Sequence, residues 1–345
     1  MAAVRIYLPT YRRPAMLPRA LASLRAQTCP DWICELHNDD PADPRPGQLL
    51  AELGDPRLTL VTHPRNLGGT ATFNLFFRST PEPFYSILED DNWWEPEFLA
   101  TMLAAAAAHP DVTVFWANMR VAQEHANGSF TDTGHTLWSE TAGEAVRFFP
   151  WGQPQQICAA LHSNGAALFR SRPGQDFKIP EVPFAVIEPF RERMFPHPLV
   201  LVSRPLATFS HTLKTARSRD AVEWGETQAM LAATFFAGSP WTEADIARFW
   251  TEARAQRPPG TTSLILAALA HPAARPLLAH ARWRDWWVAL RGMVRRPGLY
   301  FRLRRSRVAR ADWWDFLEQH TAGRWRDQRP VMNTNPSTVC SSHPA

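Results

Sequence analysis

The chain has 345 residues, 45% hydrophobic and 20% charged, which is the balance of a globular protein long enough for two domains. Its formal net charge is only +4, and it contains no nucleic-acid recognition module. No apolar run approaches the roughly 20 residues of a membrane-spanning helix. The four cysteines show neither metal-ligand spacing nor a disulfide-like pattern. We therefore expect a cytoplasmic protein with free thiols and no signal peptide.

Short apolar runs alternate with helix-patterned segments along the first part of the chain. The pattern predicts, in order, strand 4–8, helix 16–26, strand 33–36, helix 49–53, strand 58–61, helix 71–77, strand 84–88 and a helix from about 97 to 108. Such alternation is typical of a mostly parallel sheet with helices on both faces. The sequence therefore predicts an α/β fold.

Polar side chains follow each predicted strand at the point where it ends. They are Thr10 and Arg13, Asp39 and Asp40, Arg65 and Asn66, and finally Glu89, Asp90 and Asp91. In open α/β sheets the ligand lies outside the carboxyl ends of the strands. Three consecutive carboxylates repel one another unless a cation or strong donors lie between them. This edge of the sheet is therefore the expected site.

The middle of the chain is less regular. A strand is predicted at 112–116, and the stretch 123–152 lacks periodicity, so surface loops with a short helix near Gly143 are expected there. A turn at 163–165 then leads into an apolar strand that ends at Arg170. Two further short strands are predicted at 199–202 and 207–211.

The last third of the chain changes to helical patterns. Helices are predicted at 220–236, from about 240, at 262–270, at 276–296 and at 300–319, with a hinge at 297–298. We accordingly expect one domain over 1–215, a helical region over 216–328 and a disordered tail over 329–345.

The order of these motifs resembles that of the family 2 glycosyltransferases, which have the GT-A fold. The matching stretches are the strand with Pro9-Thr10-Tyr11, the pair Asp39-Asp40, the loop with Asn66 and Gly68 followed by Asn74, the acidic run Glu89-Asp90-Asp91 ahead of Pro96, the turn and strand from Asn164 to Arg170, and His211. Each match alone is short, but all six occur in the family's order over the first 210 residues.

The resemblance implies a nucleotide-sugar donor, a divalent metal ion (Mn²⁺ or Mg²⁺) and a role for each matching residue. Asp91 would bind the metal ion, and His211 would complete the metal or pyrophosphate environment. The positions implied for nucleotide binding are Pro9, Thr10, Arg13, Asp39, Asn74, Glu89 and Asp90, with Asp39 at the base ring and the two acids near the ribose. Oxygen ligands of this kind suit hard cations.

The general base is the least regular part of the match. An inverting transferase needs a carboxylate that takes the proton of the acceptor hydroxyl. Glu188 stands where the family has a Glu-Asp pair, but Pro189 occupies the second position, and Glu181 and Glu192 are neighbouring alternatives. Glu188 could also be structural, at the start of a helix that Pro189 opens. A non-catalytic GT-A-like scaffold that binds nucleotide or glycan is therefore the alternative to a transferase.

The C-terminal region is basic and rich in tryptophan. From 275 to 310 it contains eleven arginines and one acid, Asp285. Arginine interleaved with aromatic residues over 276–319 fits two situations: helices packed on the catalytic domain, or peripheral contact with anionic lipid at the inner face of a membrane. The second would suit a lipid-linked or glycan acceptor in surface polysaccharide synthesis.

Overall fold

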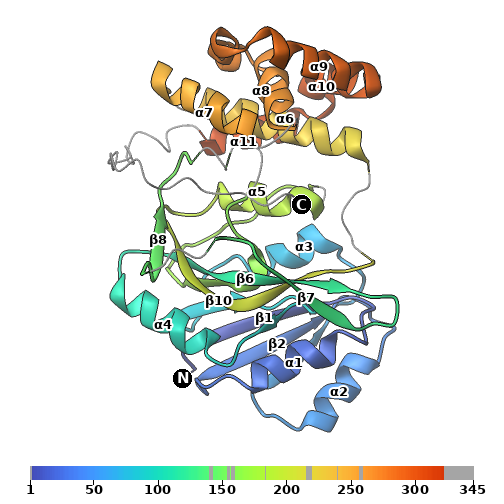
Figure 1. The fold of residues 1–345 in the computed structure, drawn as a ribbon. Helices are drawn as coiled ribbons and strands as arrows, with labels where there is room; N and C mark the ends of the chain where they lie inside the picture. The colour runs from blue at the N-terminus through green and yellow to red at the C-terminus, as the bar shows by residue number, and fades with distance from the viewer. Residues whose placement is uncertain are drawn as a thin grey trace. The chain divides into compact units, whose positions relative to one another are not determined.

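The computed structural model describes residues 2–139, 143–153, 156, 160–182, 184–214, 220–238, 240–255 and 259–321. The chain divides into two compact units (Figure 1). The first unit comprises 1–149, 162–181 and 195–216, and the second comprises 150–161, 182–194 and 217–345. The predicted tail over 329–345 lies outside the described residues.

A ten-stranded sheet, counted over the described residues, forms the centre of the first unit. Its main path is β3-β2-β1-β4-β9-β6-β10-β5. The first four neighbours, β3 (Leu58–Thr62), β2 (Trp32–Asn38), β1 (Val4–Thr10) and β4 (Phe84–Ile87), are parallel to one another. The predicted α/β class with a central sheet is thus confirmed.

Helices cover both faces of this sheet, as Figure 1 shows. Alternate residues of β1, including Ile6 and Leu8, face a core shared with α1 (Leu17–Arg25) and α4 (Phe98–Ala108), and α2 (Arg45–Leu53) packs at its edge. The intervening Tyr7 faces the other side, where its ring stacks on Phe76 just after α3 (Gly69–Asn74). The strand's two-residue period thus places apolar side chains in two separate cores.

The expectation of loops and a short helix within 123–152 is wrong for the described part of that stretch. β6 runs from Val114 to Glu124, pairs antiparallel with β7 (Phe130–Thr136), and β8 (Val146–Phe149) pairs with β10. Nearly every side chain of β7 is exposed or half-buried. A strand that is exposed to water on both faces lacks the alternation of apolar and polar residues by which strands are predicted.

The remaining strands complete the far half of the sheet. β5 (Trp93–Trp94) and β9 (Ala167–Arg170, after the short helix η2 at Asn164–Ala166) flank β10 and β4. The two short strands expected near 199–211 form one strand, β10 (Leu199–His211). Its register against β6 shifts on either side of Pro205, because proline cannot donate to the ladder.

The second unit is helical. After η3 (Phe184–Val186) and α5 (Ile187–Glu192) it contains α6 (Ala221–Ala237), α7 (Glu243–Ala255), α8 (Pro259–Ala270), η4 (Pro272–His280), α9 (Trp283–Arg295), α10 (Pro297–Ala309) and α11 (Ala311–Thr321). The predicted single helix over 276–296 is therefore wrong, since its first part belongs to η4. The expected hinge at 297–298 is instead the first turn of α10, a position that proline favours.

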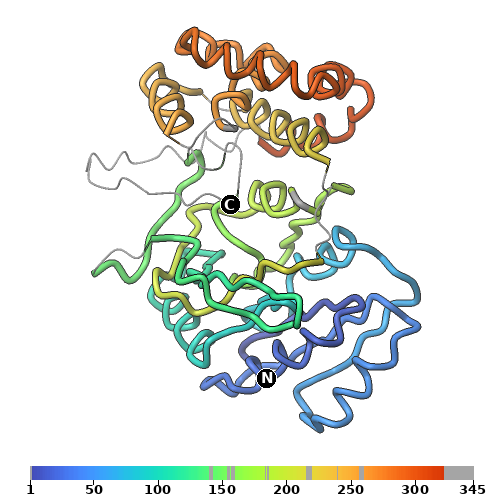
Figure 2. The backbone as a smooth tube through the Cα atoms, turned by 45° about the vertical axis from the view of Figure 1, so that its right-hand side comes forward, coloured from blue at the N-terminus to red at the C-terminus, as the bar shows by residue number. Residues whose placement is uncertain are grey.

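Figure 2 shows the path of the backbone: the chain winds through the sheet from blue to green, and the orange and red segments are the C-terminal helices. Among the described residues, no helix combines the length and the apolar composition that a membrane crossing requires.

Candidate functional site

Four neighbouring strands bring the polar side chains together. Thr10 ends β1, Asp39 follows β2, His63 follows β3, and the acidic run begins two residues after β4. Because β3, β2, β1 and β4 are adjacent and parallel, these residues share one edge of the sheet. This edge is where ligands bind in open α/β sheets.

Two adjacent carboxylates at this edge share one arginine. The hydroxyl of Thr10 donates to Oδ2 of Asp90 at 2.8 Å, and both side chains are buried. Arg13 forms an ion pair with Asp91, and its Nη1 lies 3.4 Å from Oδ1 of Asp90. The guanidinium thus holds in place two like charges that would otherwise repel each other.

Burial raises the pKa of Asp90 to about 7. The Arg13 charge works against this rise, whereas the Asp91 charge adds to it. A carboxyl group with such a pKa exchanges its proton near neutral pH and gains from any added positive charge. Perturbed carboxyl groups of this kind are common at functional sites.

The backbone of Asp91 is fixed from the opposite side. Its carbonyl oxygen accepts hydrogen bonds from Nη2 of Arg19 at 2.7 Å and from the hydroxyl of Ser210 at 2.5 Å. The Arg19 guanidinium lies 4.0 Å from the ring centre of Trp93 and 3.9 Å from that of Phe130. This aromatic clamp orients the arginine, and the arginine in turn positions the loop that carries Asp91.

Glu89 is held by its neighbour Asn92. The amide nitrogen of Asn92 donates to Oε2 of Glu89 at 2.7 Å, and its oxygen accepts from the backbone N–H of Ser210 at 3.0 Å. A Cβ on Gly165 would lie 2.6 Å from Oε2 of Glu89 and 2.7 Å from the Asn92 nitrogen. Only glycine therefore fits at Gly165 without displacing this pair.

The Asp39 carboxylate is buried and surrounded by donors. Its Oδ1 is 2.8 Å from both Nδ1 of His63 and the backbone nitrogen of Leu67, and its Oδ2 accepts from the Gly68 backbone at 3.1 Å. The next residue, Asp40, pairs with Arg12 at 2.6 Å, and this hydrogen bond lowers the pKa of Asp40. Asp39 is thus bonded to the loop that precedes α3.

The other residues expected at the nucleotide and metal sites lie in the same unit. Pro9 lies in β1 opposite His37 of β2. Asn74 exchanges two hydrogen bonds with the backbone of Ile179, at 2.8 and 3.1 Å, so it anchors that segment. His211 is exposed at the end of β10. Within the described ranges, no three His, Cys, Asp or Glu side chains are grouped closely enough to hold a metal ion.

Glu188 belongs to the second unit, where α5 carries it half-buried next to Pro189. Its neighbour Glu192 accepts hydrogen bonds from Nε2 of Gln156 at 2.6 Å and from the backbone of Leu161 at 2.7 Å. Glu192 is therefore committed to fixing this segment, and Glu181 is an exposed residue of the first unit. Of the three acids considered as the base, Glu188 is the half-buried one.

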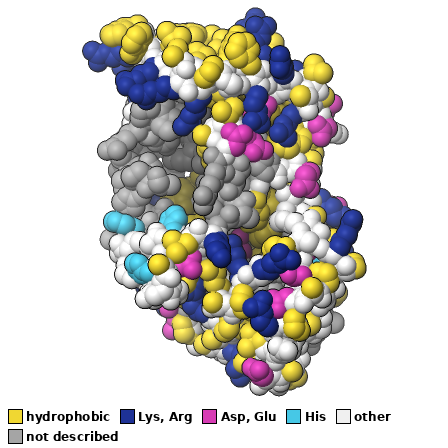
Figure 3. Space-filling view, turned by 90° about the vertical axis from the view of Figure 1, so that its right-hand side faces the viewer, with side chains coloured by type: hydrophobic (Ala, Val, Ile, Leu, Met, Phe, Trp, Pro, Cys, Tyr) yellow, Lys and Arg dark blue, Asp and Glu magenta, His cyan; other side chains and the backbone are white. Residues whose placement is uncertain are grey.

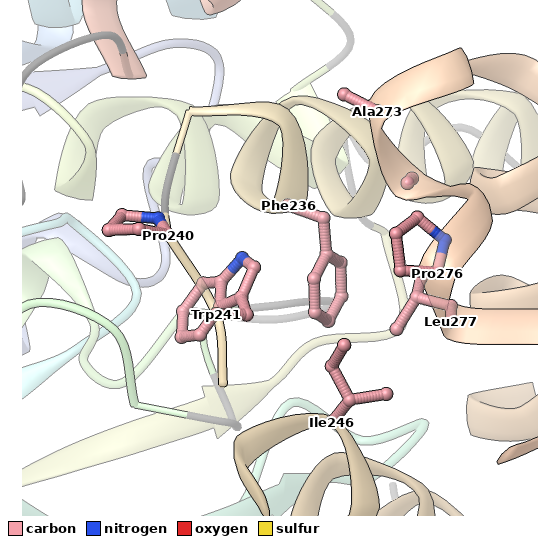
Figure 4. A pocket seen from close by; sticks show the side chains of 8 residues that line it. Phe236, Pro240, Trp241, Ile246, Ala273, Pro276 and Leu277 are labelled. Atoms are coloured by element: carbon pink, nitrogen blue, oxygen red, sulfur yellow. The ribbon is translucent and has the colours of Figure 1, made fainter. Parts of the chain in front are cut away.

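A pocket of about 210 Å³ lies in the second unit, between the end of α6, the start of α7 and η4. Figure 4 shows Phe236, Trp241 and Leu277 around it. Its lining has no charged side chain. A nucleotide diphosphate would find no counter-charge in this pocket.

Several residues of the site were not expected from the sequence. Arg19, Asn92, Ser210 and His63 all bond to the expected acids or their backbone. Ser210 is more than a hundred positions from Asp91 in the chain, so only the pairing of β10 in the sheet brings it there. Asn92 could have been found, because it adjoins the acidic run.

The fold defines the class to which the protein belongs. Residues 1–349 of S. aureus TarS, in a crystal structure with UDP-GlcNAc, share its fold with a TM-score of 0.57 at 14% identity. The match covers 95% of this chain and 93% of that one. This is the GT-A fold of glycosyltransferases.

The sequence comparisons give a family match for part of the chain. Residues 6–152 match the model of glycosyl transferase family 2. The chain is 28% identical over 102 residues to the putative colanic acid biosynthesis glycosyl transferase WcaA of Escherichia coli, and 28% identical over 123 residues to the succinoglycan biosynthesis protein ExoW of Rhizobium meliloti. These matches cover 29% and 34% of this chain, but only 37% and 38% of the two relatives.

Proposed function

We propose that this protein is a glycosyltransferase that moves a sugar from a nucleotide-diphosphate donor to an acceptor hydroxyl, with inversion at the anomeric carbon. The family match and the biosynthetic names of the relatives favour this activity over a non-catalytic scaffold. A UDP-sugar is the donor we test first, since TarS of the same fold was crystallised with UDP-GlcNAc. A glycan or lipid-linked acceptor in surface polysaccharide synthesis fits the same relatives.

One observation carries the proposal: two adjacent carboxylates, Asp90 and Asp91, share Arg13 beside the ordered carboxylate of Asp39. Asp39 would accept a hydrogen bond from the base, and Pro9 and Thr10 would line the nucleotide pocket. Glu89 and Asp90 would lie near the ribose. Both acids contact the positively charged Arg13, which supports the proposal that a cation can bind at this position.

A divalent cation fits this donor set. Asp91 would hold it, with His211 as a further ligand, and diphosphate oxygens and water would supply the remaining ligands. When bound, Mn²⁺ or Mg²⁺ supplies positive charge that stabilises the leaving diphosphate. The chain's own residues orient the donor: Thr10 fixes Asp90, while Arg19 and Ser210 fix the backbone of Asp91.

Glu188 is the proposed general base. Pro189 restricts the backbone next to Glu188, so the half-buried Glu188 side chain has a defined position on α5. It would take the proton of the acceptor hydroxyl as the oxygen attacks the sugar. We propose that the reaction takes place in the cytoplasm, where nucleotide-sugar donors would be available to the enzyme.

Calorimetry with UDP, GDP and dTDP, each with Mn²⁺, tests the donor site. We expect UDP binding that needs Mn²⁺ and that is weakened at least about tenfold in Asp91→Asn, because a charged ligand is lost. Asp132→Asn, at an exposed aspartate of β7, is the matched control and should bind normally. If no nucleotide diphosphate binds with or without Mn²⁺, the proposed function is wrong.

A transfer or donor-hydrolysis assay tests the base. Glu188→Gln should lower the rate by about 100-fold or more while leaving UDP binding unchanged, since general bases contribute roughly that much. Glu181→Gln, at an exposed glutamate of the first unit, is the control. A Glu181→Gln variant that loses turnover while Glu188→Gln keeps it would move the base to Glu181.

We also propose that the helical region contacts an anionic membrane surface. α9 exposes Trp283, Trp287, Leu290 and Val294 on one stripe, each at least 50% exposed. These four positions recur at helical spacing, so they lie along one face. Arg284, Arg291 and Arg295 on the same helix are exposed as well, and Figure 3 shows yellow and dark-blue side chains side by side over the C-terminal helices. Such a mixture is typical of interfacial helices on anionic lipid.

The buried aromatic residues of this region support a division of roles. Trp313 and Trp314 of α11 are buried, so they serve packing within the unit, whereas the α9 stripe is left for a partner. The arginines beside the stripe select an anionic bilayer as that partner. Peripheral contact would bring the enzyme to a lipid-linked acceptor.

Flotation of the intact chain with vesicles tests this contact. We expect binding to phosphatidylcholine vesicles only when they contain phosphatidylglycerol, and release at high salt. The double variant Trp287→Ser with Leu290→Ser should no longer float, whereas Trp224→Ser, at an exposed tryptophan of α6, should float normally. Equal flotation of all three proteins would refute the membrane proposal.

A further inference from the structure

A row of four side chains connects Asp39 to the middle of the sheet. Nδ1 of His63 lies 2.8 Å from Oδ1 of Asp39, Nε2 of His63 lies 3.0 Å from Nδ1 of His37, and Nε2 of His37 lies 3.3 Å from Oε2 of Glu35. We call these four residues the histidine row. None of the sequence motifs of the site includes His37 or His63.

The sheet itself builds this row. Glu35 and His37 lie on β2 two positions apart, so their side chains project from the same face. His63 directly follows β3, which is the parallel neighbour of β2, and its backbone donates to the carbonyl of Asn38 at 3.0 Å. Both rings are buried, and Phe76 packs edge-on against His37 with ring centres 4.8 Å apart. The two rings are therefore enclosed and fixed in place, while Glu35 at the end of the row is half-buried.

The number of available protons limits which nitrogen atoms of the two rings can be protonated. The row has three contacts, and it ends in a carboxylate on either side. A carboxylate only accepts, and a neutral imidazole supplies one N–H and one acceptor nitrogen. Two neutral rings thus supply two protons for three contacts, so one contact must lack a proton.

The contact without a proton is the one between His37 and Glu35. It is the longest of the three, and Glu35 already pairs with Arg5, which also binds Glu82 through two hydrogen bonds of 2.6 and 2.7 Å. The pKa of His37 is lowered, chiefly by burial. The hydrogen bond and the charge of Glu35 act to raise it, whereas His63 and Arg78 act in the same direction as burial. A third proton at His37 is therefore disfavoured at neutral pH.

The two remaining protons then have defined places. His37 donates from Nδ1 to Nε2 of His63, and His63 donates from Nδ1 to Asp39. Oδ1 of Asp39 is filled by this bond and by the Leu67 N–H, while Oδ2 accepts one bond, from Gly68. A carboxylate oxygen accepts two, so Oδ2 keeps one acceptor position for a ligand.

We propose that His63 is a positioning residue for the nucleotide base, with its tautomer set by His37. It orients Asp39, whose Oδ2 then offers the base a hydrogen-bond acceptor. The site then selects bases that present a ring N–H, such as uracil, over cytosine, which presents a bare ring nitrogen. This proposal rests on the proposed nucleotide site at Asp39, but the state of the histidine row can be measured without nucleotide.

Nitrogen NMR of ¹⁵N-histidine-labelled protein, free of ligand and near neutral pH, reads the tautomers directly. Spectra of His37→Leu and His63→Leu assign the two rings. We expect both rings to be protonated at Nδ1, and a changed Nε2 chemical shift for His63 in His37→Leu, because that nitrogen loses its hydrogen-bond donor. A His63 ring protonated only at Nε2 in the intact protein would refute the proposal, whatever the protein binds.

Two amide variants then test the positioning role by calorimetry with UDP and CDP in the presence of Mn²⁺. The amide nitrogen of His63→Asn occupies the place of Nδ1, so it still donates to Asp39, whereas that of His63→Gln occupies the place of Nε2 and does not. We expect His63→Asn to bind UDP within about threefold of the parent, and His63→Gln about tenfold more weakly with a smaller preference for UDP over CDP.

Equal UDP binding by the two amide variants, at equal melting temperature, would overturn the positioning role. His135→Gln, at an exposed histidine of β7, serves as the control for histidine loss itself. If the parent protein binds neither nucleotide while NMR shows the expected tautomers, the proposed function fails but the histidine row stands.

Discussion

At the scale of single residues, the site depends on where charge is buried. Asp90 is enclosed and bound by Thr10, while Asp91 is partly open and holds Arg13. Adjacent carboxyl groups in one chain segment therefore have different environments. In the proposed site this difference would separate the roles of the two acids, with the pKa of Asp90 near neutral pH and Asp91 as the metal ligand.

The pKa of Asp90 predicts how stability changes with pH in the metal-free protein. Because the folded-state pKa is about 7 and the ordinary value is 3.8, the folded chain binds a proton between these values that the unfolded chain lacks. This group's contribution to the free energy of unfolding therefore falls as pH rises from about 4 to about 7, and is constant above that. The melting temperature should therefore decline over this pH range, and the decline should be smaller in Asp90→Asn. An equal decline in the two proteins would contradict the raised pKa of Asp90.

The sequence predicted the charged members of the site because they follow strand ends. Thr10, Asp39 and the acidic run lie at the carboxyl ends of three strands whose apolar patterns are clear. Arg19 and Ser210 could not be predicted in the same way. Their contacts with the Asp91 carbonyl depend on the packing of α1 and on the register of β10, which no local pattern specifies.

At the scale of elements, the best predictions concern segments that bury one face. β1, β2, α1 and α4 each carry apolar residues at their own period, and the structure has them close to the expected bounds. β7 was missed because its side chains face water on both sides. The helix expected over 276–296 was misjudged because η4 and α9 are both rich in apolar residues, and only the capping of α9 separates them.

That cap supplies a prediction for Asp285. Its carboxylate accepts from the backbone of Arg282 at 2.8 Å and from Nη2 of Arg254 at 2.7 Å, and it is buried. Asp285→Ala removes both bonds, leaves a helix N–H and a guanidinium without their partner, and should lower the free energy of unfolding by about 2 kcal/mol. Urea denaturation measures this, with Asp315→Ala at an exposed position of α11 as control. Equal denaturation midpoints would show that the cap contributes nothing.

At the scale of the whole molecule, the two units interleave along the chain. The segments 150–161 and 182–194 lie between parts of the sheet in sequence but belong to the helical unit. The sequence suggested one boundary near 215, because composition changes there from strands to helices. Composition could not show that α5, with Glu188, packs with helices that follow a hundred residues later.

This interleaving predicts that donor binding and transfer can be separated by one packing change. Phe190 of α5 is fully buried, with its ring centre 6.0 Å from that of Trp313. Phe190→Ala should cost about 3 kcal/mol of stability, because it leaves a cavity beneath the helix that carries Glu188. The residues proposed to bind nucleotide all lie in the first unit, so Mn²⁺-dependent UDP binding should persist.

We therefore expect Phe190→Ala to lose most of its transfer activity while its dissociation constant for UDP stays within about threefold of the parent value. Calorimetry, an activity assay and urea denaturation on the same full-length preparation measure the three quantities. Phe301→Ala, at an exposed phenylalanine of α10, is the control and should change none of them. If Phe190→Ala loses UDP binding and transfer activity together, the helical unit is needed for donor binding as well. The proposal that this unit contributes only the general base would then be wrong.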